Sequence, residues 1–257
     1  MQAVILAGGL GTRLSEETME KPKPLVEIGG KPILWHIMKT YSYYGVNDFI
    51  ICCGYKGYLI KEYFKNYSLN NSDIEFNLQN DSMEIKNSSK ENWKILCIDT
   101  GSETQTGGRL KRVKDFIKDD TFHFTYGDGV GDINISKLEE FHSTKGTLAT
   151  VTGVSPPGRF GALSIDYDKN LVIKFDEKPE TGNTWINGGY FVLNKKVLDY
   201  IPGDQSPFED IPLKKLTSEK NLSVFLHEGY WQPMDTLREK NILTDLVLTK
   251  KAKWMKW

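Results

Sequence analysis

The sequence has almost no net charge, few cysteines and no long apolar run. Its 33 basic and 34 acidic residues give a formal charge of -1, so no overall field would attract nucleic acid or an anionic membrane. Its three cysteines, Cys52, Cys53 and Cys97, form no CxxC pair and predict reduced thiols. We therefore expect a cytoplasmic protein with neither a nucleic-acid nor a membrane partner.

The first apolar run, from Ala3 to Ala7, is also too short to export the chain. It lacks a charged segment before it and stops at Gly8 and Gly9. A signal peptide or a membrane span requires a longer apolar stretch. We expect neither in this part of the chain.

Two common nucleotide-binding motifs are missing from the glycine-rich loop that follows this run. The loop reads Leu6-Ala7-Gly8-Gly9-Leu10-Gly11-Thr12-Arg13-Leu14. Counted from Gly9, a dinucleotide fingerprint requires a third glycine where Leu14 stands, and a P-loop requires a Gly-Lys-Ser/Thr sequence that is absent. The spacing therefore argues against a dehydrogenase and against a P-loop enzyme.

The loop still has the chemistry of a phosphate site. Its glycines let backbone N–H groups approach a phosphate closely, and Arg13 offers a planar, permanently charged fork to phosphate oxygens. Lys23, in Lys21-Pro22-Lys23-Pro24, adds a second cation on a backbone that the two prolines restrict. The competing interpretation is a glycine turn with solvated basic side chains.

Short apolar strands alternate with helices in the first half of the chain. We predict strands at Gln2–Leu6, Phe49–Cys53, Ile95–Ile98 and Phe122–Tyr126. We predict helices at Pro32–Tyr44, Lys56–Lys65 and Thr106–Ile117, the last of them capped by Thr106. This alternation favours an α/β fold: a Rossmann-like, doubly wound sheet, mixed but mostly parallel and flanked by helices. Ligands of such sheets gather at the carboxyl ends of strands.

The second half is richer in strand signals. We predict strands at Leu148–Val154, Ala162–Ile165, Val172–Phe175 and Gly189–Leu193, as a partly antiparallel extension of the same sheet in a single domain. Asn66–Asn92 and Pro202–Pro207 are predicted surface insertions. The tail from Lys250 to Trp257 either packs against a neighbouring molecule or lies free in solvent.

Two aspartates are candidate metal ligands. Asp128, in Tyr126-Gly127-Asp128-Gly129, closes an apolar strand and suits Mg²⁺, which takes one or two carboxylates together with waters and phosphates. Asp235 lies just before a predicted helix, so its position in the sequence suits a helix N-cap and a metal ligand equally well. The four histidines, His36, His123, His142 and His227, show no metal spacing and are interpreted as packing or surface residues.

Several of these segments carry a family resemblance. Gly8–Leu14, Lys21–Pro24 and Glu27–Ile33 together resemble the signature of the sugar-phosphate nucleotidylyltransferases. Lys31–Met38 is similar to the glucose-1-phosphate cytidylyltransferases in particular. The match continues through residues 106–113, 124–132, 156–163, 185–193 and 229–238, and weakens over residues 66–102 and 202–219. The resemblance implies the nucleotide-diphospho-sugar transferase fold, with a smaller antiparallel sugar-binding portion.

The resemblance also implies a reaction. A cytidylyl group passes from CTP to α-D-glucose 1-phosphate by Mg²⁺-assisted in-line displacement, giving CDP-glucose, a precursor of deoxysugars in surface polysaccharide, and pyrophosphate. Residues 1–130 would mainly bind nucleotide and residues 131–257 mainly sugar phosphate, in a homo-oligomer. The alternatives are another nucleotide (UTP, dTTP or GTP) or another sugar phosphate, and a regulatory subunit that binds nucleotide sugar without catalysis.

The family's functional positions transfer to individual residues of this sequence. The implied catalytic residues are Arg13, Lys23, Asp128 and Asp235, and the implied metal ligands are Asp128 and Asp235. The nucleotide-binding set is Leu6, Ala7, Gly8, Gly9, Gly11, Thr12, Arg13, Lys23, Thr104, Gly108, Arg109, Gly127 and Asp128. The sugar-phosphate-binding set is Tyr126, Gly161, Glu177, Lys178, Asn187 and Gly188. Because the attacking phosphate oxygen is already ionised at neutral pH, no catalytic base is expected.

Overall fold

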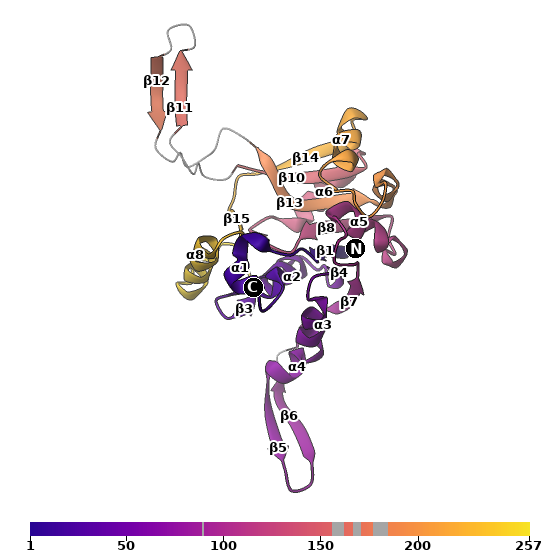
Figure 1. Ribbon diagram of the computed structural model, residues 1–257, viewed down its shortest axis with the longest axis vertical. Helices are drawn as coiled ribbons and strands as arrows, with labels where there is room; N and C mark the ends of the chain where they lie inside the picture. Colours follow the sequence, from indigo (N-terminus) through magenta and orange to yellow (C-terminus); the bar gives the residue numbers. More distant parts are fainter. Residues whose placement is uncertain (89, 156–161, 167–170, 177–184) are drawn as a thin grey trace.

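A seven-stranded sheet forms the centre of the computed structural model, which describes residues 1–88, 90–155, 162–166, 171–176 and 185–257 (Figure 1). Its strands, in spatial order, are β14 (Leu222–His227), β10 (Ala149–Val154), β13 (Ile186–Asn194), β8 (Thr121–Tyr126), β1 (Gln2–Ala7), β4 (Asp48–Cys53) and β7 (Lys94–Asp99). β13 runs antiparallel to both its neighbours, and the other adjacent strands are parallel. The predicted mixed, mostly parallel sheet is confirmed.

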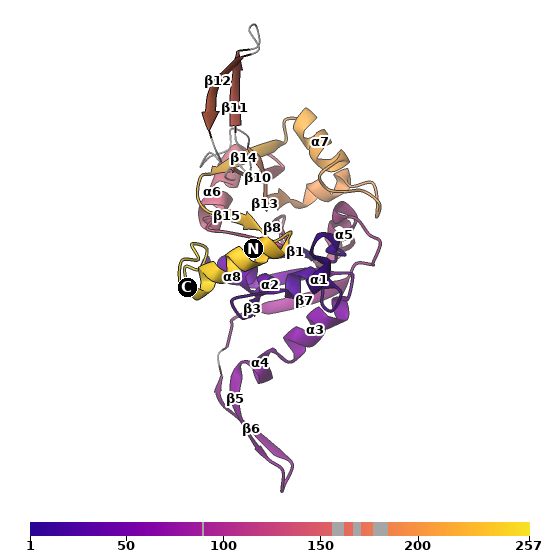
Figure 2. The same ribbon diagram turned by 60° about the vertical axis from the view of Figure 1, so that its left-hand side comes forward.

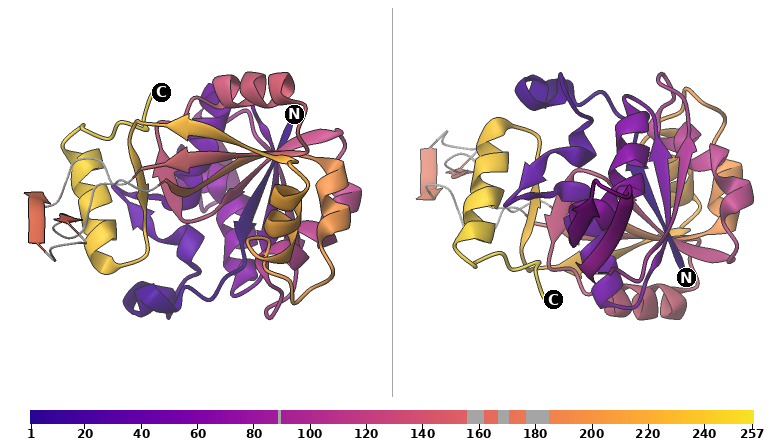
Figure 3. Two further views of the ribbon diagram at one scale, coloured as in Figure 1. Left: turned by 90° about the horizontal axis from the view of Figure 1, so that it is seen from above. Right: turned by 90° about the horizontal axis from the view of Figure 1, so that it is seen from below.

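Helices lie on both sides of this sheet (Figure 3). The α-helices are α1 (Ser15–Thr18), α2 (Ile33–Tyr43), α3 (Gly57–Lys65), α4 (Tyr67–Asn70), α5 (Thr106–Arg112), α6 (Ile135–Lys145), α7 (Ile211–Ser218) and α8 (Leu237–Leu248). Short 3₁₀ helices are η1 (Thr12–Leu14), η2 (Lys23–Leu25), η3 (Lys114–Phe116) and η4 (Lys195–Tyr200). Among the described residues, none of the helices is both long and hydrophobic enough for a transmembrane span.

The central strand β1 separates two hydrophobic cores. Successive side chains of a strand point to opposite faces, so Ala3 and Ile5 pack with α2 whereas Val4 and Leu6 pack with α5. Because both faces are covered, every residue of β1 is buried. This explains the unbroken apolar run at the start of the sequence.

The order of strands around β1 creates a crevice. The chain places β4 and β7 on one side of β1 and then returns to place β8 on the other side. Where the strand order reverses in this way, the loops that leave neighbouring strands diverge at their carboxyl ends. The loop after β1 and the turn after β8 therefore border the same crevice, as the sequence predicted.

The remaining strands form small separate sheets. β11 (Ala162–Asp166) and β12 (Leu171–Asp176) pair only with each other in the described part of the chain, so their prediction as an extension of the main sheet is wrong. Pairing between strands this close in sequence has a small loop-closure cost. The predicted insertion at residues 66–92 contains α4 and a hairpin of β5 (Ser72–Asn77) and β6 (Ser82–Ser88), which projects from the body in Figure 1.

The helix predicted from Thr106 to Ile117 is shorter than expected. α5 ends at Arg112 and is followed by η3, and the N-cap residue is Gln105. Thr106 does not cap the helix, because its hydroxyl accepts a hydrogen bond from the Phe208 amide and donates one to Glu209. A contact with a distant segment has replaced the local cap.

The carboxyl-terminal tail folds onto its own chain, so the expectation that it lies free in solvent is wrong. The Trp254 side chain is 1% exposed and stacks on Tyr230 at 5.5 Å between ring centroids. Its indole N–H donates to Nδ1 of His36, whose pKa burial lowers to about 4, so the imidazole is neutral at pH 7. Just before the tail, α8 lies beside α1, where Lys240 forms an ion pair with Glu17 (Figure 2).

Candidate active site

A cavity of about 280 Å³ occupies the crevice between the loop after β1, the start of α5 and the turn after β8. Its lining residues are Leu6, Ala7, Gly8, Gly9, Gly11, Thr12, Arg13, Lys23, Pro24, Thr104, Gln105, Thr106, Arg109, Tyr126, Gly127 and Asp128. Of the residues predicted to bind nucleotide, Gly108 alone does not line the cavity. The structure thus brings three segments that are distant in sequence to one small space.

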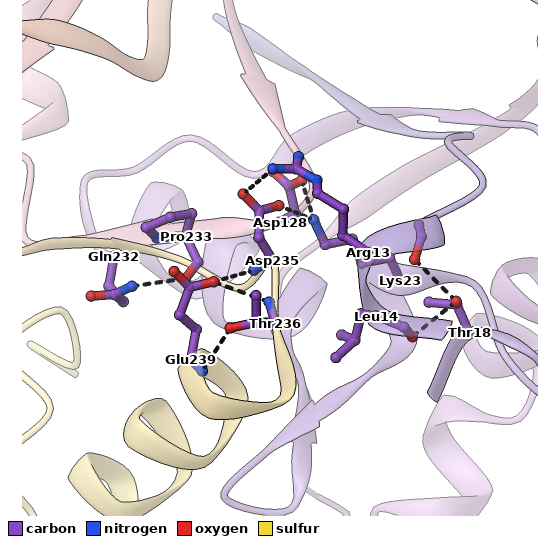
Figure 4. A network of polar contacts seen from close by, with 11 residues as sticks. Arg13, Leu14, Thr18, Lys23, Asp128, Gln232, Pro233, Asp235, Thr236 and Glu239 are labelled. Atoms are coloured by element: carbon purple, nitrogen blue, oxygen red, sulfur yellow. Dashed lines mark hydrogen bonds and ion pairs between the residues drawn. The ribbon is translucent and has the colours of Figure 1, made fainter. Parts of the chain in front are cut away.

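Lys23 lies between two carboxylates beside this cavity (Figure 4). Its Nζ atom is 2.7 Å from Oδ2 of Asp128 and 2.7 Å from Oδ1 of Asp235. Arg13 Nη1 lies 2.8 Å from Oδ2 of Asp235. Burial by itself lowers the pKa of Lys23, but the two aspartates outweigh it and raise the pKa above its usual value. Lys23 is therefore a permanent cation at the centre of the cluster.

A two-stranded ribbon brings the two aspartates together. β9 (Gly129–Gly131) follows Asp128, and β15 (Trp231–Pro233) precedes Asp235. The two strands pair antiparallel, with Gly129 opposite Pro233, and the Met234 amide donates to the Asp128 carbonyl at 2.8 Å. This pairing fixes the two carboxylates on the same ammonium although they are far apart in sequence.

Asp235 is not the N-cap of α8. Thr236 holds that position: its hydroxyl accepts from the Glu239 amide at 3.3 Å. The Glu239 carboxylate accepts in return from the amides of Thr236 and Asp235, which completes a capping box. Because Thr236 satisfies the helix terminus, the Asp235 carboxylate is left for Arg13 and Lys23.

Arg109 is a structural support of the cavity wall. Its guanidinium donates to the carbonyls of Cys53, Gly101 and Ser102 and to the Thr100 hydroxyl, at 2.6–3.3 Å. Burial lowers the pKa of Arg109, but no physiological pH removes its charge. A Cβ atom on Gly8 would lie 2.2 Å from Arg109 Nη1. The glycine therefore lets the loop after β1 pack directly on this side chain.

The residues predicted to bind sugar phosphate are only partly described. Tyr126 lines the cavity, and Asn187 Nδ2 lies 3.5 Å from its hydroxyl. The Gly188 carbonyl accepts from the Trp231 indole at 2.7 Å, which ties β13 to the ribbon that carries Asp235. Gly161, Glu177 and Lys178 lie outside the described residues.

Comparisons with known proteins show the family of this chain. The family model for nucleotidyl transferases matches residues 2–237. The chain belongs to this family. Glucose-1-phosphate cytidylyltransferase of Salmonella typhi is 55% identical over 258 residues that cover 100% of both chains. A probable glucose-1-phosphate cytidylyltransferase of Bacillus subtilis is 48% identical and covers 95% of this chain and 94% of its own.

Solved structures of other proteins share the fold. HddC from Yersinia pseudotuberculosis superposes with a TM-score of 0.69 at 28% identity, over 96% of this nucleotidyl transferase and 99% of HddC. A second structure of HddC, in complex with GMP-PN, gives a TM-score of 0.68. A thymidylyltransferase structure from Bacillus anthracis, at 19% identity and a TM-score of 0.69, shows the common fold alone.

Sequence reasoning missed part of this nucleotidyl transferase's cavity wall. Pro24 and Gln105 line the cavity, and Glu209 contacts two of the lining side chains, Thr106 and Tyr126. The loop signature around Lys23 makes Pro24 foreseeable. Glu209 lies in residues 202–219, where the family resemblance is weak, and no local pattern marks it as a neighbour of the cavity.

The roles of Asp235 and its neighbour can be separated by substitution. We expect Thr236→Ala to lower the free energy of unfolding by about 1 kcal/mol, because a helix cap is lost. Asp235→Asn keeps the cap, so the free energy of unfolding should change by less than about 1 kcal/mol. Its turnover should fall about a hundredfold. Urea denaturation and pyrophosphate release measure the two effects. Loss of stability without loss of turnover in Asp235→Asn would contradict this division.

Proposed function

We propose that this protein transfers a cytidylyl group from CTP to α-D-glucose 1-phosphate, forming CDP-glucose and pyrophosphate. The observation that carries the proposal is the cluster of Arg13, Lys23, Asp128 and Asp235 beside a glycine-lined cavity. Similarity over the full length of the Salmonella typhi cytidylyltransferase supports the choice of CTP and glucose 1-phosphate.

The reaction needs positioned charge rather than a proton acceptor. The attacking group is a sugar phosphate oxygen that is ionised at neutral pH, so catalysis reduces to orientation and charge neutralisation around the α-phosphorus. In this proposal Arg13, whose side chain is largely exposed at the mouth of the cavity, binds the departing pyrophosphate. Lys23 would extend toward the α-phosphate and add a second positive charge there.

We propose that Asp128 and Asp235 hold Mg²⁺. Two carboxylates that approach one point suit this ion, which fills its remaining positions with water and phosphate oxygens. Among the described residues, no group of three or more His, Cys, Asp or Glu side chains is placed to hold a metal ion. The proposed site therefore rests on the two aspartates, together with water and phosphate oxygens. When bound, Mg²⁺ supplies positive charge to the triphosphate.

The remaining predicted residues complete the proposal. Leu6, Ala7, Gly8, Gly9, Gly11, Thr12, Thr104, Gly108, Arg109, Gly127 and the catalytic cluster would serve the nucleotide. Tyr126, Gly161, Glu177, Lys178, Asn187 and Gly188 would serve the sugar phosphate. Residues 1–130 then mainly bind nucleotide and residues 131–257 mainly sugar phosphate, with Asp235 as the contribution of the second half to the metal site.

We further propose that the enzyme acts in the cytoplasm as a homo-oligomer. Its three free cysteines are consistent with a reducing compartment. The β5–β6 hairpin projects from the body and exposes Phe76, Leu78, Met83 and Ile85, which is unusual for an isolated hairpin in water. A second copy of the chain would cover such an apolar arm.

Light scattering on the purified protein measures the oligomeric state. We expect a mass that is a multiple of 29.3 kDa, the mass of one chain. Substituting Phe76 and Leu78 by serine should shift the distribution toward the monomer, because the apolar arm is weakened. A single species at the mass of one chain for the unaltered protein would exclude the oligomer.

The substrates are tested by a pyrophosphate-release assay with CTP, UTP, dTTP and GTP, each offered with several sugar 1-phosphates. We expect CTP with glucose 1-phosphate to give the highest kcat/KM, and chelation of divalent ions to abolish turnover. Asp128→Asn should lose about a hundredfold in rate because one negative ligand is removed. A preference for UTP would exclude the cytidylyltransferase, and product binding without turnover would favour a regulatory subunit.

A further inference from the structure

The segment before α7, expected to be a surface insertion, packs tightly against the start of α5. The Gln105 amide donates to the Asp204 carbonyl at 2.8 Å, and the Gly108 amide donates to the Ser206 carbonyl at 3.3 Å. A Cβ atom on Gly107 would lie 2.6 Å from the Ser206 carbonyl oxygen, and one on Gly108 would lie 2.5 Å from Asp204 Cα. The two glycines allow this approach, so one side of the predicted surface insertion at Pro202–Pro207 packs on α5 while Pro202, Asp204 and Gln205 stay exposed.

Phe208 anchors the end of this segment. Its side chain is buried, with its ring centroid 5.2 Å from that of Phe124 and 5.8 Å from that of Phe191. Its amide donates to Thr106 Oγ1 at 2.8 Å. Because Phe208 is held by both the core and α5, the position of the next residue, Glu209, is also fixed.

Glu209 joins two walls of the cavity. Thr106 Oγ1 donates to Oε2 of Glu209 at 2.6 Å, and the Tyr126 hydroxyl donates to Oε1. Thr106 comes from the start of α5 and Tyr126 from the end of β8, and both line the cavity. One carboxylate therefore links the wall proposed to face the nucleotide with the wall proposed to face the sugar.

The two walls depend on Glu209 to different degrees. Thr106 is part of α5 and also accepts the Phe208 amide, so it keeps a partner when the carboxylate is removed. The Tyr126 hydroxyl has one other contact among the described residues, the Asn187 amide at 3.5 Å, which is a weak hydrogen bond. Loss of Glu209 would therefore loosen mainly the Tyr126 hydroxyl, because the ring itself packs against Phe124 and Phe191.

We propose that Glu209 is a positioning residue for the sugar phosphate, acting by holding the Tyr126 side chain at the cavity wall. The inference rests on the proposed function, since it assigns the Tyr126 wall to the sugar phosphate. Glu209 does not touch the reacting atoms in this account. Removing Glu209 should weaken the binding of glucose 1-phosphate and leave the binding of CTP nearly unchanged.

Steady-state kinetics of Glu209→Ala tests this effect. We expect KM for glucose 1-phosphate to rise about tenfold, the usual scale for one charged hydrogen bond, and KM for CTP to change less than about twofold. Glu209→Gln should recover most of the loss, because its side-chain carbonyl still accepts from Tyr126. The Ala variant combined with Tyr126→Phe should be no worse than either single variant, because both remove the same contact.

Glu219 provides a matched control. It accepts a hydrogen bond from the Tyr200 hydroxyl at 2.6 Å, and both residues lie on the surface apart from the cavity lining. Glu219→Ala removes a tyrosine–carboxylate contact of the same kind and should leave both KM values unchanged. Thermal unfolding of each variant verifies the fold, and Tyr126→Phe tests the same contact independently of the α7 segment.

The outcomes separate the inference from the function on which it rests. If the unaltered enzyme forms CDP-glucose but Glu209→Ala and Tyr126→Phe both behave like Glu219→Ala, the positioning role is overturned and the proposed function stands. An equal rise in both KM values also overturns it. If the unaltered enzyme forms no CDP-glucose from CTP, both the function and the inference fail.

Discussion

The structure of the site depends on one ammonium group held between two carboxylates. Two aspartates that face the same point repel each other, and a mostly buried position strengthens that repulsion. Lys23 compensates for it at 2.7 Å from each, and Arg13 adds a further positive charge on the solvent side. The protein thus holds a compact group of charges beside the cavity before any ligand binds. In the proposed reaction, Asp128 and Asp235 would exchange Lys23 for Mg²⁺, which leaves the ammonium group for the phosphates.

The backbone around this cluster explains how the charges stay in place. Pro22 and Pro24 restrict the segment that carries Lys23, and the β9–β15 ribbon fixes both aspartates. The capping box of Thr236 and Glu239 then starts α8 without using the Asp235 carboxylate. Because Thr236 and Glu239 satisfy the start of α8, the Asp235 carboxylate is available to Arg13 and Lys23. In the proposed reaction, these side chains serve the triphosphate and its metal ion.

The sequence predicted the parts of this arrangement that depend on short, local sequence patterns. The unbroken apolar run of β1, the glycine-rich loop and the position of Asp128 after β8 all follow from short patterns read in order. It did not predict β9 and β15, which are three residues long and contain glycine or proline, so no periodicity marks them. The local pattern left Asp235 open between a helix cap and a metal ligand, and the family resemblance favoured the metal ligand. The structure assigns the cap to Thr236.

Contacts between distant segments are the part of the structure that local patterns leave out. Gly108 was predicted to bind nucleotide, whereas the neighbours that require small residues at Gly107 and Gly108 are Ser206 and Asp204. A glycine in the sequence indicates that a small residue is required, but it does not show which distant segment packs against it. Trp254 is a similar case, since nothing near the end of the sequence indicates that His36 and Tyr230 form its binding surface.

A crystal structure with CTP and Mn²⁺ would show whether Asp128 and Asp235 bind one divalent ion. Anomalous scattering would locate the ion independently of the protein coordinates. We expect one ion bound by an oxygen of Asp128 and an oxygen of Asp235 at about 2.2 Å, with phosphate oxygens and water at its other positions. An ion bound elsewhere, while Asp128 and Asp235 remain paired with Lys23 in the presence of CTP, would contradict this expectation.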